Sequence, residues 1–279
     1  MTPVNQADPV VATADLFRLD GKVAIVTGAA GLLGEHHAAA LRAAGAHLVL
    51  SDVAVDDCEA RADQLRAADH GAGRILSSAC DVRDAASWQR MLDAAMAEFG
   101  RVDVLINNAA LTMKTPTAAY GASAAECPLE DWEAIMGVNL TGVFLGCQTI
   151  GRQMLRQGSG SIINIASLYG VVSPNFRIYP GTGLNQPVPY AVSKGGVIAL
   201  TRYLAGAWAE HGVRVNCITP GGVFNSQPEL FVQRFSQLNP MGRMSQPDEL
   251  RGALLYLASA ASGYCTGHNL VVDGGWTIW

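Results

Sequence analysis

The sequence has few charged residues and no cluster of basic ones. Of its 279 residues 15% are charged, and 19 scattered Lys and Arg against 24 Asp and Glu leave a net charge of -5. A nucleic-acid binder ordinarily carries a basic patch or stripe, so this pattern argues against nucleic acid as a partner. We therefore expect a small-molecule ligand.

Cysteine is present without the spacing that metal sites or disulfide frameworks need. There is no C-x-x-C motif, so we expect no metal site. Buried free thiols in a reducing compartment fit isolated cysteines better. The residues concerned are Cys58, Cys80, Cys127, Cys147, Cys217 and Cys265.

Targeting and membrane-spanning segments are also missing from the pattern. The first twenty residues lack a basic start followed by an apolar stretch and a small-residue cleavage site, and no later segment stays apolar long enough to span a bilayer. We expect a cytoplasmic protein without membrane partners, with residues 1–20 as an N-terminal arm.

The chain does contain a regular alternation of β-branched runs and Ala- and Leu-rich stretches, which is typical of strand–helix units feeding a parallel sheet. Expected strands span residues 23–27, 47–51, 74–78, 104–107, 161–165, 214–218 and 269–272. Expected helices span residues 32–44, 56–68, 85–99, 129–157, 190–211 and 247–259. We predict an α/β fold: a doubly wound, seven-stranded parallel sheet with helices on both faces, in one domain of residues 21–279.

Two stretches break this alternation. Residues 170–189 combine Pro, Gly and aromatic residues without a helical or alternating pattern, and residues 222–246 follow a Pro-Gly turn with mixed character. Long irregular segments inside a compact domain are usually binding loops or lids, so we expect these two to contact substrate.

A glycine-rich turn follows the first expected strand and opens the first expected helix. Gly28, Gly31 and Gly34 would let a pyrophosphate approach backbone N–H groups at the positive end of that helix. The position after the first strand predicts a dinucleotide site, although such a turn can also serve packing alone.

Acidic residues end the second and third expected strands. Asp52, eighteen residues after Gly34, would accept hydrogen bonds from an adenosine ribose and repel a 2′-phosphate, and no Arg or Lys occurs from 51 to 60 to receive that phosphate. The cofactor is therefore predicted to be NAD rather than NADP. Asp81 would accept from the adenine amino group. Both residues can instead be structural, Asp52 as a helix cap.

Tyr190 and Lys194 stand four residues apart on an expected helix, so their side chains share one face. An ammonium near a phenol favours the phenolate, which would suit Tyr190 to general acid/base catalysis. Alone, this pair recurs by chance on exposed helices.

Taken together, these motifs resemble the short-chain dehydrogenase/reductase family from about residue 20 to 276. The ordered set is the glycine turn, Asp81, Asn107-Asn108-Ala109-Ala110, Asn139, Ser167, Tyr190-x-x-x-Lys194, Pro220-Gly221 and Val272-Asp273-Gly274-Gly275. The resemblance implies a single-domain Rossmann fold, NAD(P)(H), and hydride transfer between nicotinamide and a carbonyl or secondary alcohol.

The resemblance also implies a role for each catalytic position. Tyr190 would exchange a proton with the substrate oxygen, and Ser167 would hydrogen-bond the same oxygen. Lys194 would lower the phenol's pKa and bind the nicotinamide ribose, while Asn139 would hold a water near Lys194. The cofactor contacts implied in addition are Leu32, Leu33, Val53, Val82, Asn108, Ala109, Ala110, Pro220, Gly221, Val223 and Asn225.

The sequence departs from the family pattern beside the reaction centre. Ser167 and Tyr190 are 23 residues apart instead of the family's usual dozen or so, and Asn225 stands where the family often has Thr. The insert is rich in hydrogen-bonding groups, which suit a polyhydroxylated or anionic ligand better than an alkyl chain. Candidate substrate contacts are Lys114, Asn175, Arg177 and Tyr179, with the two cations able to bind an anion.

The resulting prediction is an NAD-dependent oxidoreductase that acts on a secondary alcohol or anomeric hydroxyl of a sugar, sugar acid or polyol. The insert and C-terminus loosely resemble family members of bacterial sugar metabolism. A 3-oxoacyl or other ketone reductase, and a non-catalytic nucleotide-binding protein, are the alternatives. Family members are commonly homotetramers, so that assembly is expected here.

Overall fold

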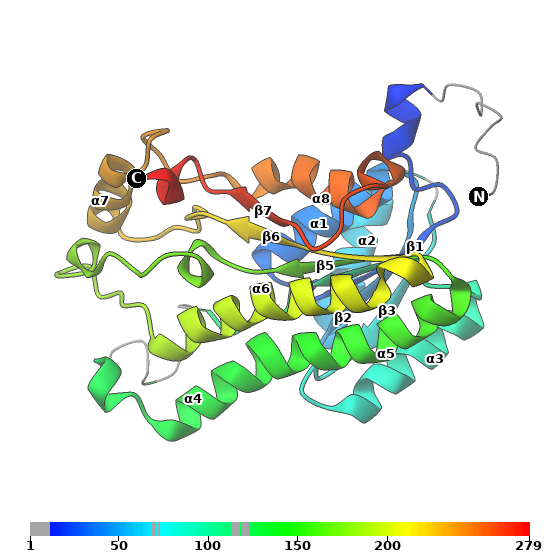
Figure 1. The fold of residues 1–279 in the computed structure, drawn as a ribbon, viewed down its shortest axis with the longest axis horizontal. Helices are drawn as coiled ribbons and strands as arrows, with labels where there is room; N and C mark the ends of the chain where they lie inside the picture. The colour runs from blue at the N-terminus through cyan, green and yellow to red at the C-terminus, as the bar shows by residue number, and fades with distance from the viewer. Residues whose placement is uncertain (1–11, 69–70, 72, 113–117, 119–122) are drawn as a thin grey trace.

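The structure, a computed structural model, describes residues 12–68, 71, 73–112, 118 and 123–279. In this part of the chain seven parallel strands form a sheet of order β3-β2-β1-β4-β5-β6-β7, which confirms the predicted doubly wound fold (Figure 1). The strands are β1 (Val23–Thr27), β2 (His47–Asp52), β3 (Ile75–Ala79), β4 (Val104–Asn107), β5 (Gly160–Ile165), β6 (Val213–Pro220) and β7 (Asn269–Val272).

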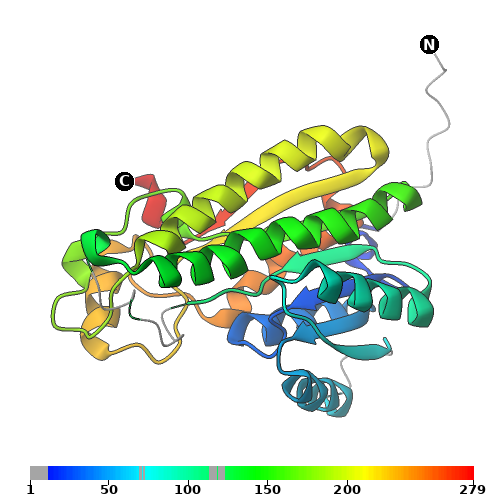
Figure 2. The same ribbon diagram turned by 90° about the horizontal axis from the view of Figure 1, so that it is seen from below.

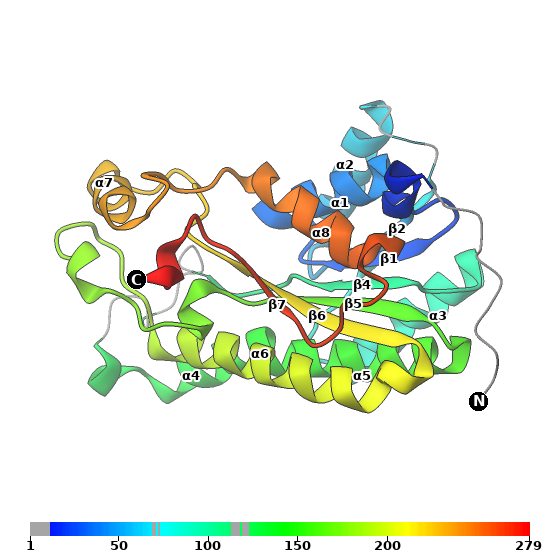
Figure 3. The same cartoon turned by 45° about the horizontal axis from the view of Figure 1, so that its top comes forward.

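Helices cover both faces of the sheet, so most strand residues are apolar on both sides. On β1, Val23 and Ile25 join one core cluster, whereas Ala24 and Val26 join the other. The first face is covered by α3 (Ala85–Phe99), α5 (Gly142–Gln157) and α6 (Val188–Trp208), and the second by α1 (Leu32–Ala43), α2 (Val55–Ala67) and α8 (Arg251–Ala258). Figure 3 shows the sheet between these two helix layers.

The expected helix over 129–157 is divided into three parts. It consists of α4 (Leu129–Met136), a π-helical turn (Gly137–Thr141) and α5, and α5 lies beside α6 (Figure 2). By length and composition this continuous helix could cross a membrane, which corrects the expectation that no segment is apolar enough. Half of its most apolar window is buried inside the protein, as expected for a helix that covers a sheet.

The expectation of an irregular segment over 222–246 is wrong in part, because α7 (Glu229–Leu238) lies inside it. Its Phe231 and Phe235 join Ile178 and Tyr179 of the insert, and Trp276 near the C-terminus, in a third apolar cluster. The insert, α7 and the C-terminus therefore fold against one another beyond the carboxyl ends of the strands (Figure 1).

The strand order reverses at β1, whose neighbours are β2 and β4. In open α/β sheets the loops at such a reversal diverge to opposite faces and leave a crevice at the carboxyl ends of the strands. The glycine turn after β1 and the Asn-Asn-Ala-Ala segment after β4 both begin at this point.

Candidate active site

A cavity of about 780 Å³ lies at this reversal point and extends under the insert and α7. Its lining brings together the predicted catalytic face of α6, the glycine turn, the ends of β2 and β3, and the Pro220 loop. The predicted residues in the lining are Gly28, Gly31, Leu32, Leu33, Asp52, Val53, Asp81, Val82, Asn108, Ala109, Ala110, Ser167, Tyr190, Lys194, Pro220, Gly221, Val223 and Asn225.

The glycines of the turn are required by close backbone contacts. Gly28 has φ +63°, and a Cβ there would lie 2.8 Å from Ala109 Cα. A Cβ on Gly34 would lie 2.2 Å from the Gly28 carbonyl oxygen, so Gly34 serves the packing of α1 on the turn and is outside the lining. Gly31 is the N-cap of α1 and offers no side-chain acceptor to the first N–H groups of that helix.

The end of β4 is tied to the same turn. The Thr27 hydroxyl accepts from the N–H groups of Asn108 and Ala109 at 3.1 and 3.2 Å. Asn108 Nδ2 donates in turn to the carbonyls of Thr27 and Gly28. Asn108 therefore fixes the floor of the cavity through its side chain.

Asp52 ends β2 with its carboxylate at the glycine turn. Its oxygens accept from the backbone N–H of Val53 at 2.8 Å and of Ala30 at 3.3 Å. No described Lys or Arg forms an ion pair with Asp52 within 4.0 Å. The carboxylate thus lies at the glycine turn, in the cavity lining, without an ion pair to a described cation.

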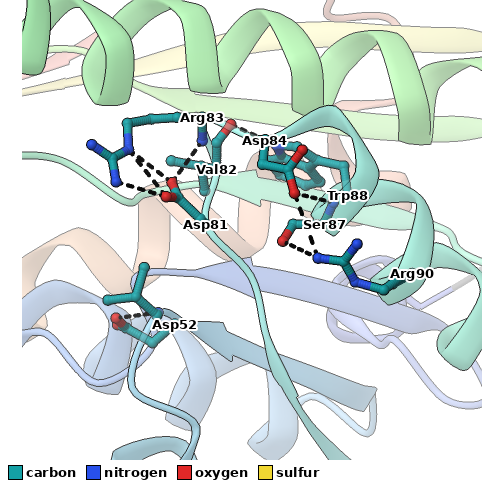
Figure 4. A network of polar contacts seen from close by, with 9 residues as sticks. Asp52, Asp81, Val82, Arg83, Asp84, Ser87, Trp88 and Arg90 are labelled. Atoms are coloured by element: carbon teal, nitrogen blue, oxygen red, sulfur yellow. Dashed lines mark hydrogen bonds and ion pairs between the residues drawn. The ribbon is translucent and has the colours of Figure 1, made fainter.

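Asp81, just past β3, is paired with a cation that the sequence analysis did not single out. Arg83 binds the Asp81 carboxylate through Nη2 at 2.7 Å and Nε at 3.0 Å (Figure 4). This hydrogen bond holds the pKa of Asp81 below its usual range. Arg83 also lines the cavity, and its spacing of two residues from Asp81 was the available sequence signal.

Tyr190 and Lys194 point into the cavity from the first turns of α6. Lys194 is buried, its Nζ donates to the Ile165 carbonyl at 2.7 Å, and that nitrogen lies 5.7 Å from the centre of the Tyr190 ring. Burial lowers the pKa of Lys194 to about 8. Burial also raises the pKa of Tyr190 above its usual value of 10, and a hydrogen bond with Ser167 opposes that rise.

Ser167 follows β5 and is held against α6 by a short turn. Its hydroxyl caps the 3₁₀ turn η5 (Leu168–Gly170) by accepting from the Tyr169 N–H at 3.3 Å. A Cβ on Gly170 would lie 2.7 Å from the backbone carbonyl carbon of Lys194. This close approach sets the distance between Ser167 and the face of α6 that carries Tyr190 and Lys194.

Asn139 lies in the π-helical turn and is fully buried. Its Oδ1 accepts from the Leu111 N–H at 2.8 Å, and its Nδ2 donates to the Leu111 carbonyl at 3.1 Å. Leu111 lines the cavity, whereas Asn139 does not. The amide thus anchors the segment after β4, and the predicted role of holding a water stays a prediction.

The loop after β6 is fixed by its own side chains. A Cβ on Gly221 would lie 2.6 Å from Asp273 Cα, so the loop can pass Asp273 only with glycine there. Gln227 Oε1 accepts from the Asn225 N–H at 2.7 Å, and its Nε2 donates to the Val223 carbonyl at 2.9 Å.

The predicted substrate contacts have other partners. Asn175 caps the 3₁₀ turn η6 (Phe176–Ile178) through the Arg177 N–H, and Arg177 itself is exposed. Tyr179 is buried against Phe231, and its hydroxyl lies 2.7 Å from that of Tyr169. None of the three lines the cavity, and Lys114 falls outside the described residues.

Other residues form the wall around Ser167 and Tyr190. Tyr169 comes from η5, and all the others come from residues 170–189 and 222–246, the two stretches that the sequence predicts to contact substrate. The wall consists of Tyr169, Leu184, Gln186, Ser226, Gln227, Phe231, Phe235 and Met244.

Known proteins are similar to this chain in sequence. The family model described as "Enoyl-(Acyl carrier protein) reductase" matches residues 28–277. D-threitol dehydrogenase of Mycolicibacterium smegmatis is 41% identical, with 94% of this chain and 95% of that protein covered. Galactitol 2-dehydrogenase (L-tagatose-forming) of Cereibacter sphaeroides is 37% identical, with 95% and 98% covered.

Solved structures agree with the sequence comparisons. A short-chain type dehydrogenase/reductase from Mycobacterium marinum is 35% identical with a TM-score of 0.84, over 95% of this chain and 99% of that one. A gluconate 5-dehydrogenase from Burkholderia cenocepacia in complex with NADP and tartrate is 32% identical with a TM-score of 0.85, over 96% and 100%. The chain therefore belongs to the short-chain dehydrogenase/reductase family.

Proposed function

We propose that this protein is an NAD(H)-dependent dehydrogenase that oxidises a secondary alcohol of a sugar alcohol or related sugar derivative. The observation that carries the proposal is the meeting of Ser167, Tyr190 and Lys194 with the glycine turn in one cavity. The names of the relatives, which include dehydrogenases of threitol and galactitol, support a polyhydroxylated substrate.

The residues around the glycine turn fit a dinucleotide. Gly28, Gly31 and the first N–H groups of α1 form a cradle that admits a pyrophosphate, and side chains at these glycines would fill or distort it. The chemistry that a nicotinamide dinucleotide would supply there is an acceptor for the hydride of the alcohol carbon. Lys194 would hold the nicotinamide ribose, and the Val223 loop would face the nicotinamide itself.

The protein's own part in the reaction is the transfer of one proton. Tyr190 would take the hydroxyl proton of the alcohol while Ser167 donates a hydrogen bond to the same oxygen. The buried Lys194 ammonium favours the phenolate form of Tyr190, because an opposite charge offsets part of the cost of burying it. Asn139 would support this arrangement by fixing Leu111 beside the reacting groups.

The preference for NAD over NADP rests on Asp52. Its unpaired carboxylate at the ribose position would repel a 2′-phosphate, and the nearby cation Arg83 is already bound to Asp81. Two similar structures contain NADP, and the test of the NAD preference therefore compares both cofactors.

The test is a screen for NAD⁺ and NADP⁺ reduction with tetritols, hexitols, aldonates and simple secondary alcohols. A second screen measures the oxidation of NADH and NADPH with 3-oxoacyl substrates, which tests the alternative of a ketone reductase. We expect activity on polyols with NAD⁺, and a Tyr190→Phe variant about 10²–10⁴-fold less active because its general base is lost. Full activity of that variant would contradict the proton transfer. Turnover confined to 3-oxoacyl substrates with NADPH would replace the proposed function.

We also propose that the protein is a cytoplasmic homotetramer. Phe144 on α5 and Tyr203 on α6 are 42% and 76% exposed on the helix layer that covers one face of the sheet. Burial of these side chains against a second copy would remove apolar area from water. Light scattering coupled to size exclusion measures the assembly, and a mass of 29.3 kDa would show a monomer.

A further inference from the structure

Gln186 is a buried polar residue in the cavity wall whose amide nitrogen lacks a partner. The residue is 5% exposed, and among the described residues no acceptor is within hydrogen-bond distance of Nε2. Leaving a buried donor unsatisfied costs about 1–3 kcal/mol, so such groups in native proteins call for an explanation. Nε2 itself is buried against protein atoms, but no hydrogen bond among the described residues holds it there. Because Gln186 lines the cavity, rotation of its side-chain amide would let the N–H groups meet an acceptor that the ligand supplies.

The backbone holds Gln186 at a fixed place relative to the reacting groups. Its N–H donates to the Asn185 Oδ1 at 2.8 Å, and the next residue, Pro187, is the N-cap of α6. Gln186 thus enters the cavity four residues before Tyr190, at the point where the insert joins the catalytic helix. Because Gln186, Ser167 and Tyr190 line the same cavity, a substrate held by Ser167 and Tyr190 would lie in the space that Gln186 borders.

The wall around Gln186 carries no charge among the described residues. The described charged residues of the lining are Asp52, Asp81 and Arg83 at the ends of β2 and β3, and Lys194, which lies beneath Tyr190 and donates to the Ile165 carbonyl. A carboxylate or phosphate of a ligand beside Gln186 would lose its water, and Lys194 is the one described cation of the lining near it. Burying an anion without a paired cation costs free energy.

The cations near the insert are directed elsewhere. Arg177 is exposed and outside the lining, and Arg234 on α7 donates to the carbonyls of Ile178 and Pro180. The anion-binding role expected of Arg177 therefore lacks support from its position.

We propose that Gln186 determines substrate specificity by donating a hydrogen bond to a hydroxyl oxygen of a neutral polyol, at a carbon other than the one oxidised. The inference rests on the proposed function and adds to it that the substrate is an uncharged sugar alcohol and not a sugar acid.

The test compares Gln186→Met, which keeps the length of the side chain and removes its donor, with Gln233→Met, the same change at an exposed position of α7 outside the lining. The substrates are a tetritol, the aldonate of the same length, and 2-butanol. For Gln186→Met we expect kcat/KM on the tetritol to fall about 10- to 100-fold, mainly through KM. We expect less than a threefold change on 2-butanol and an unchanged Kd for NADH.

Gln233→Met should match the wild type throughout. An equal loss on the tetritol and on 2-butanol would show a merely structural role for Gln186, and no loss on the tetritol would also overturn the proposal. A wild-type kcat/KM that is tenfold higher for the aldonate than for the tetritol would overturn the proposal that the substrate is a neutral polyol.

If the wild type oxidises none of these alcohols, the proposed function is wrong, whatever the role of Gln186. Calorimetric titration of the tetritol into the NADH-bound wild type and Gln186→Met proteins would then decide the role of Gln186. A Kd at least tenfold weaker in the variant supports the proposal, and an equal Kd, or no binding to either protein, overturns it.

Discussion

Lys194 is a single side chain whose position serves the proposed reaction at a cost in stability. It is 3% exposed, and burial alone lowers its pKa to about 8. Its described hydrogen bond, to the Ile165 carbonyl, involves no negative charge. The folded state therefore holds a cation that water would solvate better, and it holds that cation where Tyr190 and a bound ribose need it.

Replacing this cation should stabilise the protein while abolishing activity. We expect Lys194→Met to raise the free energy of unfolding at pH 7 by about 1–2 kcal/mol, because the desolvation cost disappears while the Ile165 carbonyl loses its donor. The folded pKa of about 8 lies below the unfolded value of about 10.4. The unfolded wild type thus binds more protons between these values, and raising the pH stabilises the folded wild type there.

Urea unfolding from pH 7 to 10.5 measures this effect. The stability advantage of Lys194→Met should be full up to about pH 8 and shrink as the pH approaches 10.4. A constant difference between the two proteins over that range would contradict a buried, titrating ammonium.

At the scale of elements, the contact of η5 with α6 fixes the distance between Ser167 and Tyr190, the two residues proposed to contact the reacting oxygen. Ser167 comes from the end of β5 and Tyr190 from α6, so their approach depends on how closely η5 packs on that helix. Gly170 makes this approach possible, because its Cα faces the backbone of Lys194 without room for a methyl group.

Gly170→Ala should therefore separate η5 from α6. We expect kcat/KM to fall about tenfold or more, since small displacements of a general base cost much activity, and stability to fall by about 1–3 kcal/mol from overpacking. The matched control is Gly252→Ala in α8, which has open space for a Cβ and lies outside the helix layer proposed as the subunit contact. That change should stabilise by up to about 1 kcal/mol through helix propensity and leave kcat/KM unaltered. Wild-type kinetics for Gly170→Ala would refute the positioning role.

At the scale of the whole molecule, the cofactor cavity joins parts that are distant in the sequence. Its lining extends from the turn after β1 to Met244, and includes residues from both layers of helices. A ligand in this cavity contacts the folded protein in a way that the unfolded chain cannot reproduce, so binding must stabilise the fold.

We expect NAD⁺ at 100 times its Kd to raise the free energy of unfolding by about 2.7 kcal/mol. NADP⁺ at the same concentration should stabilise less, because of the Asp52 carboxylate. Thermal unfolding followed by circular dichroism measures both effects, and Asp52→Asn should narrow the difference between the two cofactors. Equal stabilisation of the wild type by NAD⁺ and NADP⁺ would contradict the predicted preference.

How well each part of the structure can be predicted depends on whether residues close together in the sequence determine it. The expected strands coincide with the observed ones to within two residues at either end, because apolar runs flanked by turn residues specify them locally. The helix α7 was missed because Pro228 and the mixed residues after it gave a weak pattern, and its stability comes from packing Phe231 and Phe235 on the insert.

The same distinction between local and distant causes explains why the predicted substrate contacts have other partners. Polar residues of the insert looked like a substrate wall, but Asn175 caps a turn and Tyr179 meets Tyr169. Hydrogen-bonding groups in a loop have many possible partners, and a sequence does not say which partner each one finds. Gln186 differs from Asn175 and Tyr179 because it is buried and its amide nitrogen has no hydrogen-bond partner among the described residues.

The sequence by itself determined the sheet, the dinucleotide turn and the Tyr190–Lys194 pair, because each follows from a local pattern: the alternation of apolar runs, the glycines at a helix start, and the four-residue spacing on a helix. Only the tertiary structure decided which residues line the cavity and which charges are already paired, as Arg83 is with Asp81. Burial and pairing are properties of segments brought together from distant positions, and no local pattern encodes them.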